Sequence, residues 1–194
     1  GGGAGRLAAG VRGGPGRGRG GCGLLRGVGG HRGRLGSLDA SECPPDVRTE
    51  PRMVQGMIGG GQRASSNAVE GAEDDADAGA VAIRFRGVSE KDVVVGIAAS
   101  GRTPFVRGAL AEARRRGAKT ALVCFNPEVR TTRRGGPDVI IAPAIGPEIL
   151  TGSTRPKAGT ATKVIRNNPA PLASVPPGPG TGKSNLATAI GVAG

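Results

Sequence analysis

The sequence predicts an α/β fold built on a mostly parallel β-sheet. Residues 92–98 form a continuous apolar run, which is typical of a strand covered on both faces. Residues 104–116 have the apolar spacing of a helix that ends at Gly117, and residues 120–125 form another apolar run. A strand, a helix and a strand at this spacing predict a βαβ unit with parallel strands and a right-handed crossover.

Further elements are expected on both sides of this unit. Residues 53–58 predict a short strand that ends at three consecutive glycines, and residues 64–83 predict one helix with an acidic outer face. Residues 138–142 predict another strand, and a helix is expected to begin near Thr151. Residues 24–27 make a poor strand, because they lack an apolar run.

Composition divides the chain into three segments, at residues 1–32, 33–165 and 166–194. The first is rich in glycine and arginine and is expected to be disordered, because ordering so much glycine costs backbone entropy. The middle segment carries the predicted α/β elements, and it is expected to be a partial domain. The last is a Pro/Gly-rich tail, for which we expect irregular structure.

The net charge of +12 belongs mainly to the flanks of the chain. Residues 1–36 contain seven arginines and no acid, whereas residues 37–148 contain fifteen basic and fifteen acidic residues. A nucleic-acid or membrane partner is therefore not expected, because such partners favour a uniformly basic face. The three widely spaced cysteines form no metal or disulfide framework and suit a reducing cytoplasm.

A candidate anion site lies where the strand over residues 92–98 turns into the next helix. Ser100 and Thr103 offer hydroxyl groups, Gly101 permits a close backbone approach, and Pro104 suits the first helical turn. Ligands of open α/β sheets bind at this end of the strands. The alternative is an ordinary helix cap, and spacing alone favours that alternative.

Two glutamates, Glu42 and Glu73, are candidates for acid/base chemistry if the fold brings them to one pocket. Glu42 precedes Cys43-Pro44-Pro45, which predicts a rigid turn that could hold its carboxylate still. The alternative for each glutamate is a solvated surface charge; Glu73, next to two aspartates, could belong to an acidic helix face.

Residues from about 33 to 165 resemble the N-acetylmuramic acid 6-phosphate etherases. The matching blocks are Gly33–Gly36, Leu38–Pro45, Met53–Gly60, Ala68–Asp74, Asp92–Pro104 and Thr151–Thr160. The resemblance implies a three-layer α/β domain of the sugar isomerase (SIS) type. It also implies a lyase of cell-wall recycling that cleaves the lactyl ether of the sugar phosphate to give N-acetylglucosamine 6-phosphate and D-lactate.

The same resemblance implies the roles of individual residues. Glu42 and Glu73 match the catalytic positions, with base and acid left unassigned between them. Ser100, Gly101 and Thr103 are expected to bind the substrate phosphate, and so are Ser153 and Thr154. No cofactor or metal is implied, the expected partner is a small sugar phosphate, and a homodimer is possible as in relatives.

The chain departs from the family at both ends. A Gly-Ala-Gly-Thr-Ser-Gly loop of the family is replaced by residues 28–33, which lack its hydroxyls; a frameshift upstream of Gly33 is one hypothesis for the change. Residues 176–190 resemble the phosphate loop of insertion-sequence ATP-binding proteins, but Pro177 replaces a required glycine. A truncated and inactive etherase, a non-enzymatic sugar-phosphate regulator and an ATP-binding fusion fragment therefore stay open as alternatives.

Overall fold

The computed structural model describes residues 25–29, 33–47, 54–129, 136–150 and 156–167. Within this part, five strands form one sheet in the order β2-β1-β3-β4-β5, and every neighbouring pair is parallel. The strands are β1 (Leu25–Gly29), β2 (Val54–Ile58), β3 (Val93–Ile97), β4 (Lys119–Val123) and β5 (Val139–Ile141). The helices are α2 (Gly33–Val47), α3 (Arg63–Ser66), α4 (Ala76–Phe85), α5 (Pro104–Arg115) and α6 (Pro156–Asn167).

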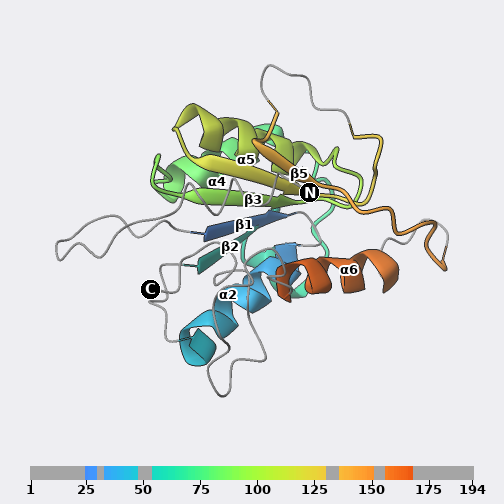
Figure 1. Ribbon diagram of the computed structural model, residues 1–194. Coiled ribbons are helices and arrows are strands. Elements are labelled where there is room, and N and C mark those ends of the chain that lie inside the picture. The colour runs from blue at the N-terminus through green and yellow to red at the C-terminus, as the bar shows by residue number, and fades with distance from the viewer. Residues whose placement is uncertain (1–24, 30–32, 48–53, 130–135, 151–155, 168–194) are drawn as a thin grey trace, which may run out of the picture.

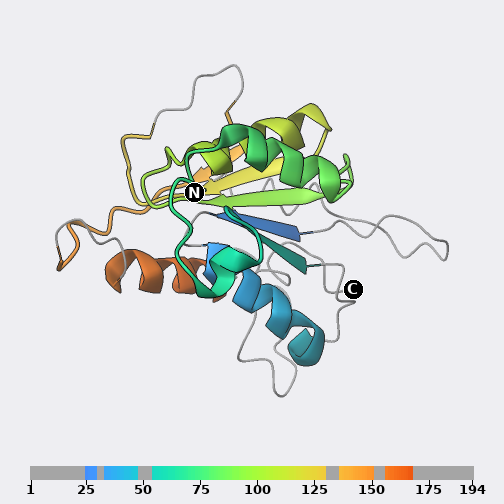
Figure 2. The same cartoon turned by 180° about the vertical axis from the view of Figure 1, so that it is seen from behind.

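Helices cover both faces of the sheet, so the predicted α/β domain with three layers is confirmed. Helices α4 and α5 lie on one face, and α2, α3 and α6 lie on the other (Figures 1 and 2). The carboxyl ends of all five strands meet at one edge of the sheet, which we call the carboxyl edge. No helix of the described segments is long and apolar enough to cross a membrane.

Strand β3 shows why the sheet needs both helical layers. All five of its residues are buried, and its side chains alternate between the two faces. Val94 belongs to the core under α4 and α5, where Val106 and Leu110 also lie. Val93, Val95 and Ile97 belong to the opposite core, together with Ala40 of α2. The continuous apolar run at 93–98 therefore forms the centre of the domain, as its pattern predicts.

The prediction of a poor strand near residue 24 is wrong. Strand β1 lies inside the sheet, with Leu25 opposite Val54 of β2 on one side and opposite Val93 of β3 on the other. Pairing on both sides supplies the backbone hydrogen bonds that the residue types alone do not predict. The folded domain therefore includes residues 25–29, which the prediction assigned to a disordered segment.

The prediction of one helix over residues 64–83 is also wrong. The chain forms the short helix α3, then turns, and then starts α4 at Ala76. Gly71 has a φ angle of 71°, a left-handed conformation that a continuous helix does not allow. Asp75 then caps α4, because its side chain accepts a hydrogen bond of 2.8 Å from the N–H of Ala78. Glu73 consequently lies in a turn and not on a helix face.

A charged cluster at the end of α5 makes the stability of the domain depend on pH. Arg115 donates two hydrogen bonds, of 2.7 and 2.8 Å, to the Glu112 carboxylate, and Arg116 donates one of 3.0 Å. Arg84 of α4 lies 3.8 Å from the same carboxylate, so the cluster connects two helices. The bonds from Arg115 above all hold the pKa of Glu112 at about 2, against an ordinary value of 4.5, although its burial acts in the opposite direction.

We expect Glu112→Gln to lower the free energy of unfolding at pH 7 by about 1 kcal/mol, because the exposed arginines are screened by solvent. A carboxyl with a lowered folded-state pKa stabilises the fold above pH 4.5 and loses this contribution as the pH falls toward 2. Urea unfolding of both proteins between pH 7 and pH 2 measures the difference. If the difference in unfolding free energy between the two proteins stays constant over this pH range, the assigned role of Glu112 is contradicted.

Candidate functional site

The candidate site is the carboxyl edge of the sheet, where the turns after β2 and β3 lie near each other. Gly59, Gly60 and Gly61 follow β2, and the turn of residues 98–103 follows β3 and leads into α5. A Cβ on Gly59 would lie 2.8 Å from the Ala72 carbonyl oxygen and 3.5 Å from the ring of Phe105. The glycine turn after β2 therefore packs against the segment before α4 and the first turn of α5.

The turn of Ser100, Gly101 and Thr103 leads from β3 into α5 and contains one left-handed residue. Gly101 is buried with a φ angle of 70°, and a Cβ there would lie 2.6 Å from Cγ2 of Val129. Ser100 is exposed, and its hydroxyl accepts a hydrogen bond of 3.1 Å from the N–H of Arg102. Thr103 is the cap residue of α5, yet its side chain makes no capping hydrogen bond. Both hydroxyl groups thus lie at the start of a helix, where an anion is stabilised.

Glu73 is joined directly to this loop through the main chain. Pro104 has no N–H, and the N–H of Phe105 donates a hydrogen bond of 2.9 Å to the Glu73 carbonyl oxygen. The first turn of α5 therefore presents fewer free N–H groups to an anion than an open helix end does. The same bond places Glu73, which is half-buried, at the carboxyl edge beside the residues of the candidate phosphate loop.

Glu42 lies in a different part of the domain. It is inside α2 and not in the rigid turn that Pro44 and Pro45 suggested, so that expectation is corrected. Helix α2 begins at the carboxyl edge, where a Cβ on Gly33 would lie 3.0 Å from the Met57 carbonyl oxygen. Further along α2, Ser37 lies over Gly56 in the middle of β2, since a Cβ on Gly56 would lie 2.5 Å from the Ser37 Cα. Helix α2 therefore runs back along the sheet, away from the carboxyl edge (Figure 1).

The separation of the two glutamates follows from the length of α2. Glu42 is nine residues beyond Gly33, which is about 13 Å along the helix axis. This places Glu42 toward the amino ends of the strands, whereas Glu73 lies at their carboxyl ends. The described part of one chain therefore places Glu42 and Glu73 toward opposite ends of the strands.

The remaining predicted ligands, Ser153 and Thr154, lie outside the described residues, as does the tail with the resemblance to an ATP-binding loop. Helix α6, which follows Ser153 and Thr154, begins at Pro156. The Glu148 carboxylate accepts hydrogen bonds of 2.9 and 3.0 Å from the N–H groups of Lys157 and Ala158, so it occupies the start of α6.

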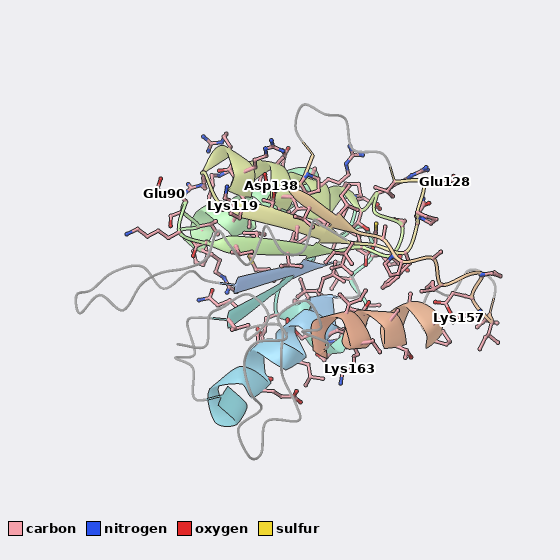
Figure 3. The ribbon with its side chains drawn as sticks, viewed as in Figure 1. Glu90, Lys119, Glu128, Asp138, Lys157 and Lys163 are labelled. Atoms are coloured by element: carbon pink, nitrogen blue, oxygen red, sulfur yellow. The ribbon has the colours of Figure 1, made fainter. Side chains whose placement is uncertain are left out.

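The two lysines of α6 do not converge on an anion site. The Nζ of Lys157 donates a hydrogen bond of 2.7 Å to the Pro147 carbonyl oxygen. Lys163 is exposed and points away from the sheet (Figure 3). The sequence did not predict the role of Glu148, because a carboxylate eight residues ahead of a helix has no short-range capping pattern.

Comparison with known proteins shows which families this chain is similar to. A family model of the glucokinase regulatory protein N-terminal SIS domain matches residues 21–114. N-acetylmuramic acid 6-phosphate etherase from Photorhabdus laumondii is 53% identical over 138 residues, which cover 71% of this chain. The chain is homologous to the N-acetylmuramic acid 6-phosphate etherases. The corresponding etherases of Cutibacterium acnes and Jannaschia sp. are 54% and 52% identical, again over 71% of this chain.

The matched part of the chain spans less than half of the length of these etherases, between 43% and 45%. The SIS match begins at residue 21, so similarity to this domain type extends upstream of Gly33. This agrees with the position of β1 inside the sheet. The similarity therefore starts earlier than the change in composition near residue 33.

Proposed function

We propose that the chain acts as an N-acetylmuramic acid 6-phosphate etherase, in the cytoplasm, in the recycling of cell-wall amino sugars. The observation that carries this proposal is the identity of 50–54% with etherases over about 70% of the chain. The products would be N-acetylglucosamine 6-phosphate and D-lactate. We further propose that Ser100, Gly101 and Thr103 bind the substrate phosphate, together with Ser153 and Thr154.

The reaction explains why two carboxyl groups are needed. A base removes the C2 proton beside the ring-opened aldehyde, and the C3–O bond breaks as an acid protonates the departing lactate oxygen. Water then adds across the C2–C3 double bond of the intermediate, with its oxygen at C3 and a proton returned to C2. The net change is addition of one water molecule. We assign these steps to Glu42 and Glu73 together, without distinguishing base from acid.

We propose that a second copy of the chain supplies the missing carboxylate. Glu73 and the phosphate loop lie at the carboxyl edge, while α2 carries Glu42 of the same chain away from that edge. Leu38 lies one helical turn before Glu42 on the same side of α2, and its side chain is 46% exposed. In a twofold dimer, Glu42 of each copy would complete the site of the other.

Incubating the purified chain with N-acetylmuramic acid 6-phosphate tests the activity. D-lactate measured with a coupled dehydrogenase should accumulate, and it should be lost in Glu42→Ala. A second candidate function is a non-enzymatic sugar-phosphate regulator, which the match to the regulatory-protein SIS domain favours. Binding of the sugar phosphate without lactate release, unchanged in Glu42→Ala, would decide for the regulator.

A further inference from the structure

The strongest unassigned feature near the candidate site is the side chain of Arg34, the second residue of α2. Its Nε donates a hydrogen bond of 2.9 Å to the Ala64 carbonyl oxygen, and its Nη2 donates one of 2.9 Å to the Asn67 carbonyl oxygen. Ala64 is the second residue of the one-turn helix α3 and Asn67 is its C-cap residue, so both acceptors belong to this turn, whose carbonyls lack partners further along the helix. Arg34 therefore joins the start of α2 to the end of α3.

The segment held in this way leads directly to Glu73. Between α3 and α4 the chain forms turns, which are less constrained than a helix or strand. Asn67 begins these turns at one end, and the hydrogen bond from the N–H of Phe105 to Glu73 closes them at the other. In between, Ala72 rests on Gly60, where an added Cβ would lie 3.2 Å from the Ala72 Cβ.

We propose that Arg34 is a positioning residue for Glu73, acting through the segment of residues 64–73. This inference rests on the proposed etherase function and deepens it, because it adds a residue that positions one of the two proposed catalytic carboxylates. The guanidinium fixes the start of the segment and the Phe105 bond fixes its end, so both are needed to hold the Glu73 carboxylate still. Misplacement of a catalytic group by about 1 Å can cost about 100-fold in rate.

The chemistry of arginine suits this role better than that of lysine. A planar guanidinium presents several N–H donors in fixed directions, so one side chain can reach two carbonyl oxygens at once. A lysine ammonium keeps the charge but lacks that fork. Arg34→Lys should therefore retain only part of the effect, whereas Arg34→Ala should lose all of it.

The test compares Arg34→Ala and Arg34→Lys with Arg63→Ala, which removes an exposed arginine from α3 itself. We expect Arg34→Ala to lower kcat by about 10- to 100-fold with KM changed by less than about threefold, and Arg34→Lys to fall between it and wild type. Arg63→Ala should keep the kcat of the wild type. Wild-type kcat in Arg34→Ala, or an equal loss in Arg63→Ala, would overturn the proposal.

Hydrogen exchange of the same proteins separates this inference from the proposed function. The amide of Phe105 and those of residues 64–73 should exchange faster in Arg34→Ala than in wild type, while those of β3 stay protected. Release of no lactate by the wild type would end the proposed function and this role with it; faster exchange would still establish the anchoring contact. Unchanged exchange in Arg34→Ala would refute the anchoring itself.

Discussion

Glu73→Gln should lower the rate of D-lactate release by about 1000-fold while the protein stays folded. Acid/base groups contribute about 100- to 10,000-fold to enzymatic rates, and glutamine has the shape of glutamate but does not act as an acid or a base near neutral pH. The main-chain bond from Phe105 to the carbonyl of residue 73 does not depend on the side chain. The phosphate loop should therefore keep its shape, and the loss should appear in kcat.

Glu70 provides the matched control for this experiment. It lies in the same segment, three residues earlier, and its side chain is exposed. Glu70→Gln removes the same charge and should keep the wild-type rate. The assignment of Glu73 fails if its glutamine variant remains within about threefold of wild type, or if both variants lose activity equally.

Gly79→Ala and Gly108→Ala should each lower the free energy of unfolding by about 3 kcal/mol. The two glycines lie where α4 and α5 meet: a Cβ on Gly79 would collide with the Phe105 carbonyl oxygen, and one on Gly108 would collide with that of Ala76. Alanine normally favours a helix over glycine by about 1 kcal/mol. Here overpacking against rigid backbone outweighs that preference, because neither carbonyl can move without separating the helices.

Urea or thermal unfolding of the variants measures this effect, with Ala111→Ser as the control. Ala111 is exposed on α5, so adding an atom there should change the stability by less than about 0.5 kcal/mol. An unchanged or raised melting temperature for Gly79→Ala would show that the helices have room to separate. Phe105 bonds to Glu73, so we also expect the destabilised variants to lose etherase activity.

The elements predicted correctly are those whose local pattern agrees with their surroundings. Strand β3 is apolar throughout and buried on both faces, and α5 has a continuous apolar stripe with arginines at its end. Strand β1 has no such pattern. Pairing with β2 on one side and β3 on the other holds it in the sheet instead. The break between α3 and α4 depends on Gly71 and on the cap at Asp75, two local signals that the apolar spacing of residues 64–83 concealed.

The candidate site was predictable only in part, for a similar reason. The position of Ser100, Gly101 and Thr103 follows from a rule about strand ends, which any parallel sheet obeys. The position of Glu42 depends on where α2 starts and how far it continues, and the two prolines after Glu42 suggested a turn instead. The contacts of Arg34 join residues 30 and 33 positions apart, and no local pattern indicates such a pair.

The central claim is that Glu73 of one copy and Glu42 of another complete one etherase site. Mixing Glu42→Ala with Glu73→Ala tests this claim most directly, because each variant alone should be inactive. Random pairing in a twofold dimer makes half of the dimers mixed, and each mixed dimer has one intact site, so about a quarter of the wild-type D-lactate release should return. The claim is contradicted if each pure variant is inactive and the fully exchanged mixture also releases no D-lactate.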